Sequence, residues 1–291
     1  MARRTAVHIE IPPLLPARVV TLAGRGEMVV RHHQHPDATR PTLLLLHGWT
    51  ASADTQFFTA YETLAADHSI VALDHRGHGR GLRPEMPFRL EDCADDAADV
   101  LSALGIDKVV TVGYSMGGPI SLLFWQRHPH LVSGMVLEAT ALEWNGTRAE
   151  RNKWRVGHVL GPVFRKFATP TFIRFGLRKA IPRGHELARF VPWLVGEIRR
   201  NDPWMVSEAG RALSMFDARP FASMITVPTA MVLTTGDRLV RPHKQNALAQ
   251  MLGAEIVELD GDHFVPLLAP REFADATRRA VSLVTRPVRV E

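Results

Sequence analysis

The sequence predicts an α/β fold, a mostly parallel eight-stranded sheet covered by helices on both faces. Three observations lead to this prediction. Short continuous apolar runs alternate with helical patterns along most of the chain, which is typical of parallel strands buried on both faces. The alternation breaks after the sixth predicted strand, where residues 141–216 are helical or loop-like. A Gly-x-Ser-x-Gly turn separates the fifth strand from the helix that follows it.

The elements are predicted in chain order from apolar runs and turn residues. Residues 18–22 and 27–31 flank Gly24-Arg25-Gly26, which is typical of a β-hairpin. Six further apolar runs predict the other strands, at 42–46, 70–73, 109–112, 135–137, 230–233 and 256–259. The helices predicted among them cover residues 57–66, 90–104, 120–128, 242–252 and 272–284.

The break in this alternation predicts two parts of the chain. Residues 1–140 and 217–291 form the core with the sheet, and residues 141–216, called the cap segment below, form a helical insertion after the sixth strand. Residues 141–219 carry 15 Lys or Arg against 7 Asp or Glu, and four of the six tryptophans. We therefore expect the cap segment to be a separate module with its own kind of surface.

The candidate nucleophile is Ser115, at the centre of Gly113-Tyr114-Ser115-Met116-Gly117. Turning a strand sharply into a helix forces the central residue into a strained backbone conformation, so its neighbours must carry little bulk. The turn then places the serine oxygen above the carboxyl end of the sheet, in front of a helix N-terminus.

A serine hydroxyl is a poor nucleophile near neutral pH and needs a base within hydrogen-bonding distance. His263 follows the last predicted strand and Asp237 follows the one before it. Because parallel strands end at one edge of the sheet, we expect both to meet Ser115. His263 would act as general base, and Asp237 would orient its ring and stabilise the imidazolium. These three residues are called the triad below.

With these residues placed, the chain resembles the α/β-hydrolase fold family over about residues 18–284, apart from the cap segment. His47-Gly48 follows the third strand, where that family carries an HG motif. Residues 74–79, Asp-His-Arg-Gly-His-Gly, resemble its D-x-R-G-H-G turn after the fourth strand. The chain order Ser, Asp, His also matches. The resemblance implies a cap after the sixth strand, and it leaves Glu138 as an alternative acid, since some relatives carry the acid there.

The tetrahedral intermediate of acyl transfer needs hydrogen-bond donors aimed at its oxygen anion. The resemblance implies that the backbone N–H groups of Met116 and Trp49 supply them. We expect the Trp49 side chain to line the acyl pocket.

The sequence disfavours a metal-binding, nucleotide-binding, disulfide-bonded or membrane-spanning protein. His32, His33 and His35 lack an acidic or cysteine partner at metal-ligand spacing, and the glycines at 77–81 lack the Lys-Ser/Thr of a phosphate loop. We therefore expect no metal and no cofactor. A single cysteine, Cys93, gives no intrachain disulfide. With no apolar run long enough for a span and no signal peptide expected, the predicted location is cytoplasmic.

The predicted activity is hydrolysis of carboxylic esters or thioesters through an acyl-enzyme on Ser115. Ser115 stands where the family's epoxide- and halide-processing members use aspartate, and Phe264 stands where its carbon–carbon bond hydrolases usually carry tryptophan. A cofactor-free perhydrolase or acyltransferase, or a carbon–carbon bond hydrolase, would use the same residues. A ligand-binding protein without catalysis is the third alternative.

The expected partner is a small acyl ester or thioester with an apolar acyl group. The basic cap segment is open to two interpretations. Its arginines are simply solvated, or they approach anionic lipid or an acyl-thioester carrier and place the protein at the membrane periphery. Nucleic acid is not expected, because no binding motif accompanies the charge.

Overall fold

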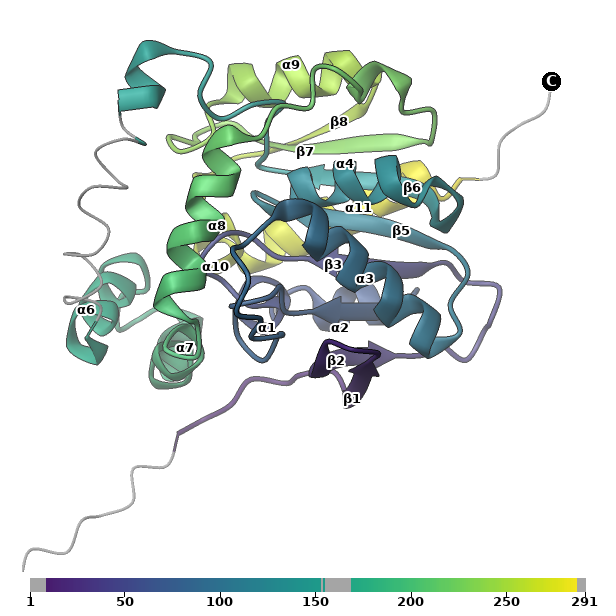
Figure 1. Ribbon diagram of the computed structural model, residues 1–291. Coiled ribbons are helices and arrows are strands. Elements are labelled where there is room, and N and C mark those ends of the chain that lie inside the picture. The colour runs from purple at the N-terminus through teal and green to yellow at the C-terminus, as the bar shows by residue number, and fades with distance from the viewer. Residues whose placement is uncertain (1–8, 153, 155–168, 287–291) are drawn as a thin grey trace, which may run out of the picture.

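The computed structural model describes residues 9–152, 154 and 169–286 (Figure 1). Within them, eight strands form one sheet in the order β1-β2-β4-β3-β5-β6-β7-β8. The β1–β2 and β2–β4 pairs are antiparallel and the others are parallel, which confirms the predicted sheet. The strands are β1 Ala17–Leu22, β2 Gly26–His33, β3 Thr42–Leu46, β4 Ser69–Leu73, β5 Val109–Tyr114, β6 Val132–Glu138, β7 Thr229–Thr234 and β8 Glu255–Leu259.

The central strands, β3 to β7, are buried on both faces. Successive side chains of a strand point to opposite faces, so Leu44 and Leu46 join one apolar core while Leu43 and Leu45 join the other. The first core also receives α3, α4 and α9, and the second receives α1, α2 and α11. These helices are α1 Ala53–Phe57, α2 Tyr61–Ala65, α3 Leu90–Leu104, α4 Gly117–Arg127, α9 Pro242–Leu252 and α11 Pro270–Val284, with the short α10 Val265–Leu268 before the last.

One predicted helix is wrong in its extent. The apolar pattern at 57–66 suggested a single helix, whereas the chain forms α1 and α2 with a turn between them. α1 begins early because Ser52 caps it: the Ser52 hydroxyl accepts from the Thr55 N–H, and the Thr55 hydroxyl accepts from the Ser52 N–H. The capping hydrogen bonds at Ser52 therefore set the start of α1 at Ala53, before the start that the apolar pattern predicts.

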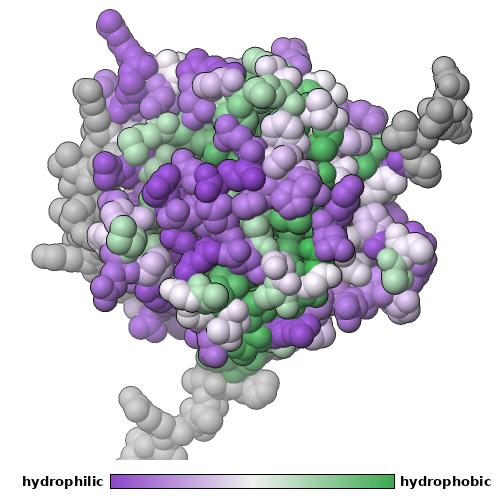
Figure 2. Space-filling view, turned by 45° about the vertical axis from the view of Figure 1, so that its right-hand side comes forward, coloured by the Kyte–Doolittle hydropathy of each residue, from purple (hydrophilic) through white to green (hydrophobic). Residues whose placement is uncertain are grey.

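In the cap segment, residues 148–152 are helical. Three labelled α-helices follow before β7: α6 Pro170–Ala180, α7 Val191–Ile198 and α8 Pro203–Met215. Figure 1 shows them together on one side of the sheet. The boundaries at residues 141 and 216 remain a prediction. Among the described helices, none is long and apolar enough to span a bilayer. The face in Figure 2 mixes hydrophilic residues with narrower hydrophobic strips.

Candidate active site

Ser115 lies in the turn between β5 and α4. Its φ is +52°, in the left-handed region that residues with a side chain rarely adopt. Its N–H donates to the Glu138 carbonyl at 2.8 Å, and its own carbonyl accepts from the Thr140 hydroxyl at 2.8 Å. These bonds from the end of β6 hold the strained turn in place.

The glycines of the turn are required by close approach of the backbone. A Cβ at Gly113 would lie 2.3 Å from the Gly117 carbonyl oxygen, and one at Gly117 would lie 2.0 Å from the Leu46 carbonyl oxygen. The turn therefore packs against the end of β3, where the loop of the HG motif begins.

His263 brings the three candidate residues together. Its Nε2 lies 2.9 Å from Ser115 Oγ, and its Nδ1 lies 2.7 Å from Asp237 Oδ2. An ionised carboxylate only accepts hydrogen bonds, so Nδ1 carries the proton and Nε2 is free to accept one from the Ser115 hydroxyl. This is the arrangement that a general base needs.

The Asp237 carboxylate is buried and fixed by the loop after β7. Oδ1 accepts from the N–H groups of Leu239 and Val240 at 2.8 and 2.9 Å. Oδ2 accepts from the Thr234 hydroxyl at 3.0 Å in addition to His263. The carboxylate therefore reaches the ring in one defined orientation.

Glu138, the alternative acid, has a different partner. It ends β6 and is fully buried, and its Oε1 accepts from the Thr277 hydroxyl at 2.7 Å. Burial raises the pKa of Glu138 to about 7. The hydrogen bond at Nδ1 of His263 belongs to Asp237 instead.

The loop with Gly48 and Trp49 passes directly beside Ser115. A Cβ at Gly48 would lie 3.2 Å from Ser115 Cβ. The His47 ring supports this loop: Nδ1 donates to the Gly48 carbonyl at 2.8 Å, and Nε2 accepts from the His75 N–H at 2.9 Å. Burial holds the pKa of His47 well below its usual range, so the ring stays neutral and keeps both bonds.

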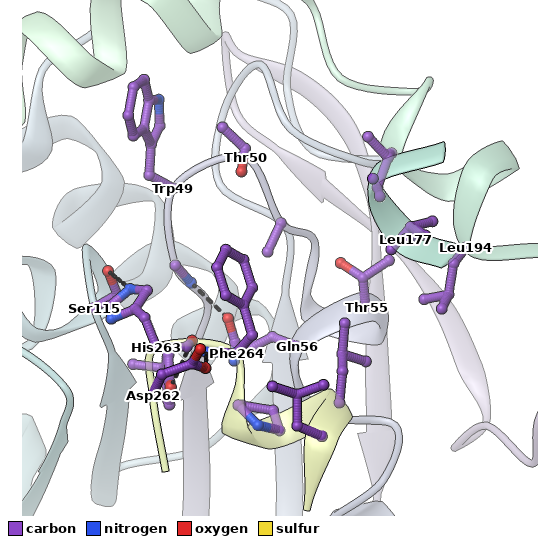
Figure 3. Close-up of a pocket in the computed structure, with 18 of the residues that line it drawn as sticks. Trp49, Thr50, Thr55, Gln56, Ser115, Leu177, Leu194, Asp262, His263 and Phe264 are labelled. Atoms are coloured by element: carbon purple, nitrogen blue, oxygen red, sulfur yellow. Dashed lines mark hydrogen bonds between the residues drawn. The ribbon is translucent and has the colours of Figure 1, made fainter. Parts of the chain in front are cut away.

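A cavity of about 620 Å³ opens over Ser115 and His263. Figure 3 shows Ser115 and His263 on one side of it and Leu177 and Leu194 across from them. Trp49 lines it, as expected from the sequence. The lining is mainly apolar. The cap segment contributes Gly176, Leu177, Lys179, Leu194 and Ile198, and the chain after β8 contributes Phe264 and, from α10, Pro266, Leu267 and Leu268.

Two residues that shape this site, Gln56 and Tyr114, were not predicted from the sequence. Gln56 lines the cavity and accepts from the Gly48 N–H at 3.4 Å. Tyr114 donates its hydroxyl to the His263 carbonyl at 3.0 Å, which ties the loop after β8 to the serine turn. Tyr114 sits inside the Gly-x-Ser-x-Gly motif, so its position was visible in the sequence, but its partner lies 149 residues away.

Comparison with known proteins shows which proteins share this fold. The family model described as alpha/beta hydrolase fold matches residues 41–270. A putative carbamate hydrolase of Agrobacterium fabrum is 29% identical over 254 residues, 83% of this chain and 93% of that protein. The crystal structure of an enol-lactonase from Burkholderia xenovorans has a TM-score of 0.76 at 20% identity, covering 91% of this chain and 100% of that one.

A shorter match is an uncharacterized protein of Mycobacterium tuberculosis, 32% identical over 97 residues. This match covers 33% of the chain and 28% of that relative's own length. The family model instead extends from the strand before the HG motif to the residues after His263. The chain belongs to the alpha/beta hydrolase fold family.

Proposed function

We propose that the protein is a serine hydrolase that cleaves carboxylic esters or thioesters through an acyl-enzyme on Ser115. The observation that carries this proposal is the pair of hydrogen bonds at His263: the Ser115 hydroxyl donates to Nε2, and Nδ1 donates to Asp237 Oδ2. The roles follow from it: Ser115 is the nucleophile, His263 the general base, and Asp237 orients the ring.

Each step balances with these groups. Ser115 Oγ attacks the carbonyl carbon while its proton passes to His263 Nε2. The tetrahedral intermediate then expels the alcohol or thiol, which takes that proton, and leaves the acyl-enzyme. Water attacks the acyl-enzyme by the same route, which releases the carboxylic acid and restores Ser115. Asp237 remains ionised and stabilises the imidazolium between the steps.

The oxyanion would be held by the N–H groups of Met116 and Trp49. Met116 directly follows Ser115 and precedes α4, so the positive end of the helix dipole lies behind the first donor. Trp49 follows Gly48, which passes within contact distance of Ser115. Donors fixed by the fold stabilise the transition state without reorganising during the reaction.

The cavity favours a small substrate with an apolar acyl group, because its lining is mainly apolar. The similarity to an enol-lactonase and a putative carbamate hydrolase is compatible with this choice, because both names denote cleavage at a carbonyl carbon bonded to oxygen or nitrogen.

A panel of p-nitrophenyl esters and acyl thioesters of increasing chain length tests the proposal. The wild-type protein should turn over several of them with an optimum set by the cavity. Ser115→Ala should lower kcat by about 10⁴-fold or more. Ser282→Ala, on the exposed face of α11, should leave kcat unchanged. Undiminished turnover by Ser115→Ala would exclude the acyl-enzyme.

Adding hydrogen peroxide or an alcohol and identifying the products would separate hydrolysis from perhydrolysis and acyl transfer.

A further inference from the structure

The loop proposed to carry an oxyanion donor is held by the junction between α7 and α8. Asn201, in this junction, donates from Nδ2 to the Thr50 carbonyl at 2.6 Å. Its Oδ1 accepts from the Gly79 N–H at 2.8 Å. The amide NH₂ group can only donate and the amide oxygen can only accept, so the two bonds fix the orientation of the Asn201 side chain.

The backbone that Asn201 holds is strained. Thr50 has φ of +67°, the left-handed region that side chains disfavour. A strained residue of this kind persists only where its surroundings fix it. Thr50 is the next residue after Trp49, so its orientation affects where the Trp49 N–H points.

The Trp49 side chain is tied to the same part of the cap segment. Its indole Nε1 donates to the Val206 carbonyl on α8 at 2.7 Å. A Cβ at Gly210 would lie 2.6 Å from the indole, so α8 packs directly against the ring. The proposed donor therefore lies between two anchors, the indole bond and the Thr50 carbonyl bond.

The junction itself is fixed to the core. The Asp202 N–H donates to the Gly77 carbonyl at 2.7 Å, and its carboxylate caps α8 through the N–H groups of Trp204 and Met205 at 2.8 and 3.0 Å. The anchors on Trp49 and Thr50 thus extend from a rigid base.

We propose that Asn201 is a positioning residue for the oxyanion hole: it couples the α7–α8 junction of the cap segment to the Trp49 N–H through the Thr50 carbonyl. The inference rests on the proposed hydrolase function. It assigns the cap segment a part in stabilising the transition state in addition to lining the cavity.

Asn201→Asp tests this coupling with little change of shape. The variant keeps the acceptor for the Gly79 N–H but replaces the donor to Thr50 with a carboxylate oxygen. Losing an oxyanion donor costs about 100- to 1,000-fold in kcat, and we expect a displaced donor to cost about 10- to 100-fold. KM should stay within about threefold, because the ground-state carbonyl depends little on the donor. Asn246→Asp on α9, which makes the same charge change away from the cavity, should match the wild type.

A second readout separates positioning from a general structural effect. The inhibition constant of a trifluoromethyl ketone, which forms an anionic tetrahedral adduct with the serine, should rise by the same factor as kcat/KM falls. Trp49→Phe removes the other anchor while keeping an aromatic ring, and it should raise that constant as well. If Asn201→Asp does not fold, Asn201→Ala, which also removes the Nδ2 donor to the Thr50 carbonyl, takes its place.

Two outcomes would overturn the inference: kcat of Asn201→Asp within twofold of the wild type, or a lower kcat with an unchanged inhibition constant. Where Asn201→Ala replaces Asn201→Asp, the same two outcomes in Asn201→Ala would overturn the inference. Failure of the proposed function looks different. The wild-type protein itself would then form no adduct with the ketone and release no p-nitrophenol.

Discussion

At the residue scale, Asp237 and Glu138, the two buried carboxylates considered as the acid of the triad, should behave in opposite ways. Asp237→Asn would let the amide donate to Nδ1 and so favour the tautomer that cannot accept the serine proton, which lowers kcat by about 10⁴-fold. Glu138→Gln should keep kcat within a few-fold, because Glu138 Oε1 contacts Thr277 and not the ring. Ester hydrolysis by the two variants measures this. The reverse ranking would make Glu138 the acid.

Glu138 should also determine part of the pH dependence of stability. Its pKa is about 7 in the folded protein against 4.5 for an ordinary glutamate. Between these values the folded state keeps a proton that the unfolded state loses, so the free energy of unfolding falls as pH rises from about 4.5 to 7. Glu138→Gln removes this contribution while its amide oxygen still accepts from Thr277.

Urea unfolding at pH 5 and pH 8 measures the effect. The wild type should lose more stability than Glu138→Gln between the two pH values. Equal losses would show that Glu138 titrates normally.

The triad residues were predictable from the sequence because each follows an apolar strand, and the carboxyl ends of parallel strands share an edge. Their hydrogen bonds in the structure agree with that geometry. Asn201 was not predictable. Its partner Thr50 lies 151 residues away, and an asparagine between two helices also suits a simple turn or cap.

At the element scale, α7 is attached to the core by a partly buried ion pair. Arg80, in the turn after β4, contacts both carboxylate oxygens of Glu197 at 2.7 and 2.9 Å. Glu197→Ala would remove this partner from the Arg80 guanidinium, which is 28% exposed. The loss should cost about 1 to 2 kcal/mol of unfolding free energy, between the values typical of surface pairs and of buried pairs. Glu10→Ala, which breaks an exposed pair with Arg189, should cost about 0.5 kcal/mol or less.

Denaturant unfolding of both variants gives the comparison. Equal effects would mean that the Arg80–Glu197 contact is no stronger than a surface pair.

The sequence predicted that the cap segment is helical, but it did not predict how α7 is attached to the core. Helical patterns repeat locally, whereas the Arg80–Glu197 contact joins residues 117 positions apart.

At the scale of the whole molecule, positive charge is concentrated in one stretch. Residues 151–185 contain nine Lys or Arg and no Asp or Glu. Within the described part of this stretch, α6 exposes Phe172 and Phe175 by 60% and 68%, with Arg178 and Lys179 in its last turn. Aromatic side chains beside basic ones are typical of helices that lie on anionic membranes.

We therefore expect weak binding to vesicles containing phosphatidylserine that decreases as salt is added, since salt screens the attraction. The double variant Arg178→Glu and Lys179→Glu should weaken it further, by about 1 kcal/mol per charge removed. Arg89→Glu with Lys108→Glu, outside the cap segment, is the matched control. Vesicle co-sedimentation at two salt concentrations measures this, and binding insensitive to both salt and the α6 charges would favour simply solvated arginines.

Labelling with a fluorophosphonate followed by peptide mapping tests the role of Ser115 most directly. The reagent phosphonylates serines that an adjacent base activates. We predict one adduct per molecule, located on Ser115, absent in Ser115→Ala and formed far more slowly in His263→Ala. Folded protein that remains unlabelled, or an adduct at another residue, would contradict the assignment of Ser115 as the nucleophile.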